Sequence, residues 1–236
     1  MIKLINNEFI KIKKSKLLLS QIIFLIIIFV VKKYSNKFLL DSLFSLIPFI
    51  GIMTCIIFSG TICGEVESGS IKYYLTKPCK RWKIYLAKLL CIYLYLTLTI
   101  FIIVVFSFLM SDYYELKYLI KYFIYSIPDY FIAMFSLYLS TKLKNQSLCV
   151  GISIFVLSFS LIISQILFGY NFNIIEYTFL PYLDFSIFKD KNTISIMNKE
   201  LNTSLSINRA IIIDFIYTII FYLIGNYKFN KKDIKN

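Results

Sequence analysis

The side chains in this sequence that could perform chemistry are few, and their types exclude most enzymatic reactions. Histidine is absent, which removes Ser-His-Asp triads, HExxH metalloproteases and most zinc sites. The five cysteines form no CxxC pair, so we expect small apolar residues rather than disulfides or metal ligands. The stretch from Gly64 to Ser70 has the glycine spacing of a phosphate loop but lacks the lysine that must reach the phosphates. We therefore predict that the chain is not an enzyme, holds no metal or cofactor, and cannot hydrolyse ATP.

The composition identifies lipid as the solvent for most of the chain. Of the 236 residues, 58% are hydrophobic and only 17% are charged, and the mean hydropathy is +0.74. A soluble domain of this length would hold about a quarter charged residues and under half apolar ones. Because a water-soluble core cannot absorb so much apolar surface, we predict an all-α, polytopic membrane protein that forms a single domain over residues 1–236.

Six apolar stretches are candidates for membrane-spanning helices. Such a helix needs roughly 20 mostly apolar residues, because only an internally hydrogen-bonded backbone is stable in hydrocarbon. The six predicted spans are Leu17–Val31, Leu43–Gly64, Tyr85–Met110, Leu119–Ser140, Leu148–Phe168 and Ala210–Gly225. An even number of spans places both ends of the chain on the same side of the membrane.

The distribution of basic residues predicts the orientation. With the N-terminus inside, the cytoplasmic segments hold 16 Lys/Arg residues and the external segments hold 8. This excess favours an N-in, C-in topology by the positive-inside rule, although the three lysines of segment 32–42 fall outside. The formal net charge of +13 is thus a topology signal, and we expect no nucleic-acid binding.

Three segments lie outside the predicted spans and are long enough to form structure. Residues 1–16 place Ile5 and Phe9 on one face of a helix and lysines around the rest, which is typical of an amphipathic helix at the cytoplasmic lipid interface. Residues 65–84 form a polar cytoplasmic loop. Residues 169–209 form the long external loop, whose many aromatic residues favour a re-entrant or surface helix pair over a loose segment.

The first half of loop 65–84 has the features of a helix start. Ser68 or Ser70 can cap a helix, and Gly69 permits a sharp entry of the chain. Glu65 and Glu67 would then lie near the positive end of that helix, where a carboxylate is favoured by about 0.3–1 kcal/mol.

The second half of the loop predicts a stop and a return to the membrane. A short helix over residues 71–76 would end at Pro78, because the residue before a proline is pushed towards extended geometry. Arg81 and its basic neighbours follow at the headgroup level, together with Trp82, the single tryptophan of the chain. The segment therefore predicts a rigid helical elbow between the second and third spans.

In this order and at this place, the residues resemble the signature loop of type-2 ATP-binding-cassette (ABC) transporter permeases. That loop has a Glu, then Gly-Ser or Gly-Thr, a Leu-x-x-Pro, an Arg, and a Lys that opens the next span. The matching positions are Glu65 or Glu67, Gly69, Ser70, Leu75, Pro78, Arg81 and Lys88. In size and style the chain is most similar to small six-span permeases that export bacteriocins and other peptide antibiotics or confer immunity to them.

The resemblance implies a function and a set of partners. The elbow, including Trp82, would be the coupling helix that docks on a separate cassette ATPase, which binds and hydrolyses the ATP. Two permeases act together in the family, so a second copy or a related permease is expected. The cargo would be a peptide antibiotic or another amphiphilic molecule, and the location the bacterial cytoplasmic membrane.

Other interpretations of the same residues remain open. Trp82 and its basic neighbours could merely anchor the chain in the interface. The protein could be an immunity factor or sensor that captures a toxic peptide without transporting it. An intramembrane enzyme would need paired catalytic groups in the spans, and the sequence offers too few of them.

Polar residues inside the predicted spans form the last candidate site. Asp129 follows Pro128, and an intramembrane carboxylate is costly enough to suggest a role with substrate or protons. Simpler interpretations are a water-mediated pair with Lys121, two turns earlier, or capping of backbone donors freed near the proline. Asp214 and Lys88 are expected to extend their charged groups to the nearer interface.

Overall fold

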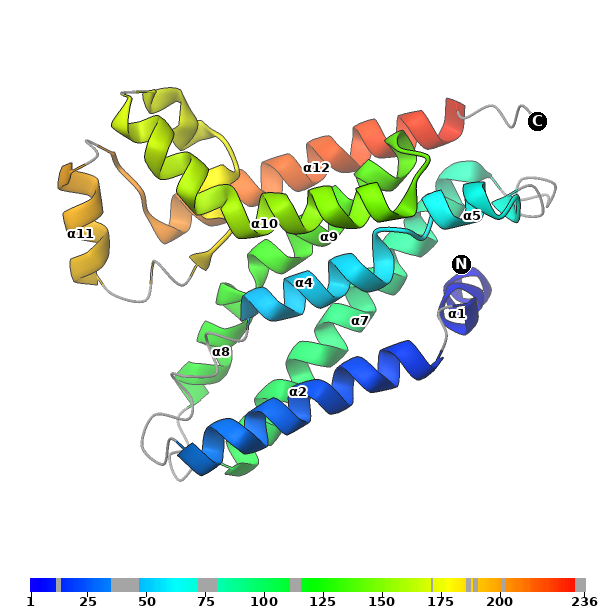
Figure 1. Ribbon diagram of the computed structural model, residues 1–236, viewed down its shortest axis with the longest axis horizontal. Coiled ribbons are helices and arrows are strands. Elements are labelled where there is room, and N and C mark those ends of the chain that lie inside the picture. Colours follow the sequence, from blue (N-terminus) through cyan, green and yellow to red (C-terminus); the bar gives the residue numbers. More distant parts are fainter. Residues whose placement is uncertain are drawn as a thin grey trace.

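The computed structural model describes residues 1–11, 14–34, 47–71, 80–110, 116–170, 172–185, 188, 191–200 and 203–231. Within these ranges the chain forms helices joined by turns, with no strand (Figure 1). Five segments are long and apolar enough to cross a membrane: Ile47–Glu67, Arg81–Phe106, Ile120–Lys142, Gln146–Gly169 and Ile207–Lys231. Each of them overlaps one of the predicted spans from the second to the sixth. The all-helical, membrane-embedded class predicted from composition is confirmed.

The helices begin and end close to the predicted boundaries. The N-terminal part contains α1 (Ile2–Lys11), α2 (Lys14–Tyr34), α4 (Ile47–Phe58) and α5 (Cys63–Glu67). The central part contains α7 (Arg81–Met110), α8 (Leu116–Tyr125), α9 (Ile127–Lys142) and α10 (Gln146–Gly169). The C-terminal part contains two short 3-10 helices, η1 (Asn173–Tyr177) and η2 (Leu180–Tyr182), followed by α11 (Lys191–Glu200) and α12 (Ile207–Lys231).

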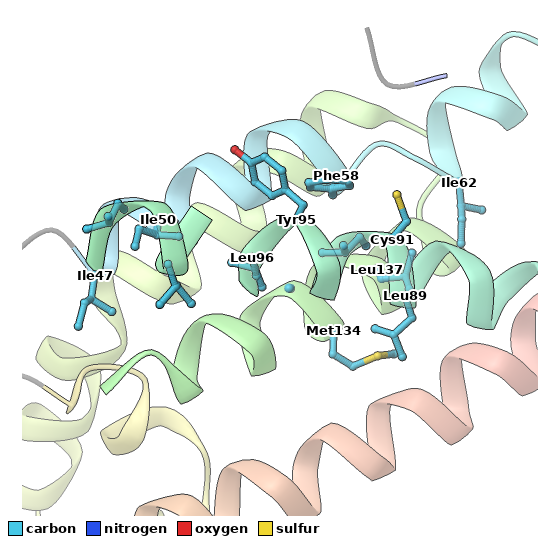
Figure 2. Close-up of a cluster of buried hydrophobic side chains, with 14 of the residues drawn as sticks. Ile47, Ile50, Phe58, Ile62, Leu89, Cys91, Tyr95, Leu96, Met134 and Leu137 are labelled. Atoms are coloured by element: carbon cyan, nitrogen blue, oxygen red, sulfur yellow. The ribbon is translucent and has the colours of Figure 1, made fainter. Parts of the chain in front are cut away.

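Helix α9 is the centre of the bundle. It packs against α4, α7, α10 and α12, and most of its side chains are buried. Figure 2 shows the main core, in which α7 residues such as Leu96 lie between α4 and α9 residues such as Ile50 and Met134. The four described cysteines are buried, and Cys63 Sγ lies 3.0 Å from Cys149 Sγ in the core. A buried central helix surrounded by other helices gives the bundle a core independent of lipid.

The outer faces of the bundle are apolar, which is the reverse of a soluble protein. Large aliphatic and aromatic side chains are exposed on α10 and α12, among them Phe155, Ile162, Phe215 and Leu223. A contiguous apolar face of this extent is stable only where it is covered, and lipid covers it in a membrane protein. The exposed faces therefore agree with the five candidate spans.

The two ends of the bundle differ in construction. At one end, which we call the α1 end, α1, α5, the first turns of α7 and α10 and the last turn of α12 come together (Figure 1). At the opposite end, which we call the cap end, η1, η2 and α11 fold over the start of α12.

The cap end has its own core and its own ion pair. Tyr182 and Phe185 are fully buried there, and burial raises the pKa of Tyr182 to about 12. Arg209 at the start of α12 donates to the Glu176 carboxylate at 2.9 Å and stacks on the ring of Tyr177. The described part of segment 169–209 is therefore a packed cap with helical turns rather than a loose loop.

Candidate functional site

A cluster of four charged residues, in which Lys88 and Glu8 are buried and Lys11 is on the outside, joins three helices at the α1 end. The Lys88 Nζ of α7 donates to Glu8 Oε2 of α1 at 2.8 Å and to Glu65 Oε1 of α5 at 2.7 Å. Lys11 Nζ donates to the same two carboxylates, at 2.5 Å to Glu8 and 2.7 Å to Glu65. We call these four residues the ion cluster. Residues separated by as many as 80 positions in the chain thus share two carboxylates and two ammonium groups.

The ion cluster explains how Lys88 is tolerated inside a membrane-spanning helix. Its side chain is 1% exposed, and a buried ammonium is costly unless it is paired and hydrogen-bonded. Both carboxylates supply that pairing within hydrogen-bonding distance. The expectation that Lys88 extends to the interface is wrong, because helix α1 and the start of α5 bring counter-charges to the lysine instead.

Glu8 occupies the inner face of α1. It lies three residues after Ile5 and next to Phe9, so the helical period that turns the apolar residues inward also turns this carboxylate inward. Burial by itself would raise the pKa of Glu8, but the ammonium groups of Lys88 and Lys11 outweigh burial and hold the pKa below its ordinary value. Glu8 is therefore an ionised anchor that fixes α1 to α7.

The lowered pKa of Glu8 predicts a pH dependence. The groups facing Glu8 are Lys88, Lys11, Glu65 and the Cys91 thiol. Because the folded-state pKa lies below the ordinary value of 4.5, the stability that Glu8 contributes is complete above pH 4.5 and is lost as the pH falls through the folded-state pKa. We expect unfolding midpoints of the wild type and of Glu8→Gln to differ at pH 7 and to converge below pH 4.5. A gap that stays constant down to pH 3 would contradict the assignment.

Glu67 makes a contact with α10 that the sequence did not predict. Its Oε1 accepts from the backbone N–H of Gln146, the first residue of α10, at 3.0 Å. The Asn145 side chain caps the same helix by accepting from Ser147 N at 2.8 Å. Glu67 thus lies at the positive end of α10, 79 residues away. The helix predicted over residues 71–76 lies outside the described residues, so the position of Glu67 relative to that helix stays a prediction.

The turn after α5 is described as far as residue 71. Gly69 adopts φ +68°, a left-handed conformation that favours glycine, so the predicted sharp entry is confirmed. Ser68 Oγ donates to Gly64 O at 2.7 Å and contacts Ser70 Oγ at 2.9 Å. The Ser68 hydroxyl closes the end of α5, the helix that precedes it. Leu75 and Pro78 of the predicted elbow lie outside the described residues.

The chain returns to described structure at the start of α7. Arg81 NH1 donates to the backbone carbonyl of Asn230 at 2.9 Å, which places a cation at the negative end of α12. Trp82 is 40% exposed, and the Lys83 ammonium lies 5.7 Å from its ring centroid. Of the two, Arg81 is committed to the bundle, whereas Trp82 leaves a large aromatic surface for lipid or for a partner.

The predicted intramembrane site of Lys121 and Asp129 is not assembled as a direct ion pair. Within the described residues no bond joins them: Lys121 lies exposed on α8, and Asp129 is 2% exposed in the first turn of α9. Ser126, a single turn residue, separates the two helices, and Asp129 N donates to Ser126 O at 3.0 Å. Asp214 is also buried, at 1% exposure, so the expectation that it extends to the interface is wrong.

Three residues of the α1 end were not predicted: Glu8, Gln146 and Asn230. The signal for Glu8 was present, since it is the one acidic residue of the basic segment 1–16 and falls on the apolar face. No local signal identified Gln146 or Asn230, because their roles depend on which helices meet.

The fold and this arrangement define a class: the chain is a polytopic helical membrane protein whose charged residues gather at one end of the bundle and at the opposite cap. The chain belongs to the family described as "Protein of unknown function (DUF2705)", whose model matches residues 9–235. No curated protein matches the sequence.

Proposed function

We propose that the chain is the membrane-spanning permease subunit of an ABC exporter of the type-2 class. It would move a peptide antibiotic or another amphiphilic molecule out of the membrane or the cell. A separate cassette ATPase would supply the energy, and a second copy or a related permease would complete the assembly in the bacterial cytoplasmic membrane.

A six-span, N-in and C-in topology requires that α2 also cross the membrane. Helix α2 has 21 residues with lysines at both ends, and its apolar part, Leu19–Val30, is shorter than the five candidate spans. We take α2 as the sixth span, because lysines at the ends of a spanning helix can extend to the interfaces. Adding α2 to the five candidate spans gives six. Helix α1 and the last turn of α12 lie at the same end of the bundle, as an even number of spans requires (Figure 1). The excess of Lys/Arg in the segments of this end favours the cytoplasm.

The observation that carries the proposal is the ion cluster. Glu65 and Lys88 are two positions of the permease-like segment, one before and one after the predicted elbow. The Lys88 ammonium binds both Glu65 and Glu8 of α1, so the two carboxylates share it. A loop fixed at both ends to buried charges can transmit a push from a docked ATPase to α7 rather than bending under it. Simple anchoring at the interface needs no such cluster, because exposed lysines and Trp82 suffice for it.

Trp82 offers the sharpest test, since its side chain is 40% exposed, whereas Arg81 and Glu67 are engaged in hydrogen bonds to other helices of the bundle. The experiment co-expresses the protein with a cassette ATPase encoded beside its gene and measures co-purification and stimulated ATP hydrolysis. We expect Trp82→Ala to weaken ATPase binding about 30-fold or more, as truncation of an aromatic hot spot does. Trp82→Tyr keeps an interfacial aromatic and separates docking from anchoring.

Three results would overturn the proposal. One is ATPase binding and stimulation unchanged in Trp82→Ala while the unfolding midpoint also stays constant. The second is modification of a Lys83→Cys variant by a membrane-impermeant maleimide added outside intact cells. The third is a native assembly without a cassette protein, which would favour the capture of a peptide without transport.

A further inference from the structure

A small pocket with two carboxylates lies where α4 and α9 begin, near the cap end. It is formed by the first turn of α4, the junction of α8 and α9, and the segment that follows η2. The described lining consists of Ile47, Pro48, Tyr125, Pro128, Asp129, Leu183, Asp184 and Phe185. These residues give the pocket apolar and aromatic walls and an acidic side, with no lysine or arginine among them.

Asp129 is the residue that makes this pocket unusual. It is 2% exposed, and its Oδ2 has no hydrogen-bond partner among the described residues. The carboxylate packs against Gly51 of α4, where an added Cβ would lie 2.5 Å from Asp129 Oδ1. Gly51 thus provides the space for a carboxylate that the surrounding protein leaves incompletely paired.

The chemistry of the lining selects among the ligands that could complete this pairing. A buried carboxylate is stabilised by a cation, and Asp184 adds negative charge on the same pocket. A divalent metal ion takes six or more oxygen ligands, and the described lining offers two carboxylates and the Tyr125 hydroxyl. The accessible space in the pocket is about 10 Å³, room for about one water-sized group, so an ammonium head can enter it while an attached apolar body must lie outside. The ammonium head would donate to the carboxylates and be attracted to the aromatic rings of Tyr125 and Phe185.

We propose that the pocket between α4, α9 and residues 183–185 binds an organic ammonium group carried on an apolar body, with Asp129 as its principal anion and Asp184 as the second. Binding to the isolated chain does not require an ATPase. That the ligand is also the transported cargo, a cationic amphiphile, rests on the proposed function.

Asp214 provides a matched control for Asp129. It is a membrane-span carboxylate at 1% exposure, and neither of its oxygens has a hydrogen-bond partner among the described residues. It does not line the pocket. Asp214→Asn therefore neutralises a carboxylate that is as buried as Asp129, but one that would not contact the ligand.

The experiment titrates the purified full chain, in uncharged detergent at pH 7, with n-hexylammonium chloride. The unfolding midpoint and the heat of binding are recorded, with n-hexanol and sodium chloride as probes that lack the ammonium or the apolar body. We expect hexylammonium alone to raise the midpoint saturably. Asp129→Asn should weaken its binding by about 10- to 100-fold, the range for a lost charge-assisted hydrogen bond. Asp214→Asn should bind as the wild type does.

Asp184 is less buried than Asp129, so Asp184→Asn can replace Asp129→Asn in the test if the latter does not fold. We expect Asp184→Asn to weaken binding by a smaller factor. The proposal is overturned if hexylammonium leaves the wild type unchanged, if hexanol or sodium chloride acts equally, or if the Asp214 variant loses binding as much as the pocket variants do. A failure of this binding test with intact ATPase coupling would remove the site and leave the transport proposal standing.

Discussion

Replacing Lys88 with methionine is expected to lower the free energy of unfolding by about 3–5 kcal/mol, the usual effect of removing one partner from a buried ion pair. Methionine preserves the length of the side chain and most of its apolar stem. The Glu8 and Glu65 carboxylates then lose the ammonium that lies 2.8 and 2.7 Å from them, and Lys11 must balance both. The loss comes from uncompensated buried charge rather than from a cavity.

The measurement is an unfolding titration of the purified protein with a denaturing detergent, compared among three variants. Lys83→Met removes an exposed lysine from the same helix and should change stability by less than about 0.5 kcal/mol. Adding Glu8→Gln and Glu65→Gln to Lys88→Met should recover much of the loss, because neutral amides leave no buried charge unpaired. Equal effects of Lys88→Met and Lys83→Met would show that the ion cluster contributes nothing.

The membrane-spanning helices could be predicted because their signal is local. A stretch of roughly 20 apolar residues needs no knowledge of its neighbours to be recognised. Accordingly α10 (Gln146–Gly169) and α12 (Ile207–Lys231) include the predicted spans and extend them by a few residues at their ends. The extensions are polar turns, such as Gln146–Ser147 after the Asn145 cap, which hydropathy does not detect.

The candidate site could be predicted only in part, because it is made of contacts between helices. The sequence pointed to Glu65 and Lys88 but offered no reason to join them, since 23 residues and an elbow separate the two. The third member, Glu8, comes from a helix that was predicted to lie in the lipid interface. Which face of α1 meets α7 depends on packing, and packing alone brings the carboxylate to the lysine.

The water-mediated pair of Lys121 with Asp129 stays a prediction, and the path of the chain between the two residues bears on it. Eight residues on a continuous helix place two side chains about 80° apart around the axis, close enough for a bridging water. In the structure Ser126 is a single turn residue of near-helical conformation between α8 and α9, and Asp129 N donates three rather than four residues back, to Ser126 O. Asp129 turns inward against Gly51, while Lys121 stays on the outside of α8. A proline in an apolar stretch marks a change of direction, and helical spacing should not be extended across it.

Several hydrogen bonds and ion pairs that join different helices lie together at the α1 end of the bundle. The ion cluster joins α1 and α5 to α7, Glu67 joins the end of α5 to the start of α10, and Arg81 joins α7 to the end of α12. Under the proposed function, a displacement of the segment between α5 and α7 would therefore reach all five of these helices. This arrangement suits a coupling role, and it predicts that mutations at this level affect stability and coupling together unless the residue is exposed, as Trp82 is.

Gly60 and Gly64 form the second contact for which we expect a large effect. Their GxxxG spacing permits close helix approach, and the partner is the Gln146 side chain at the start of α10. A Cβ on Gly60 would overlap the Cγ, Cδ and Nε2 atoms of Gln146, and a Cβ on Gly64 would lie 3.1 Å from its Oε1. The overlap involves most of the Gln146 side chain, so the whole exposed side chain must change rotamer to relieve it.

Gly60→Ala is therefore expected to destabilise the protein by about 1–3 kcal/mol, the usual range for overpacking. Gly151→Ala is the matched control: Gly151 lies in α10 with nothing within 4 Å, and alanine there should be neutral or slightly stabilising. Adding Gln146→Ala to Gly60→Ala frees the space and should restore most of the stability, which unfolding titrations can measure as a double-mutant cycle. If the two changes are simply additive, the contact between this GxxxG pair and the start of α10 is not what limits the approach of these helices.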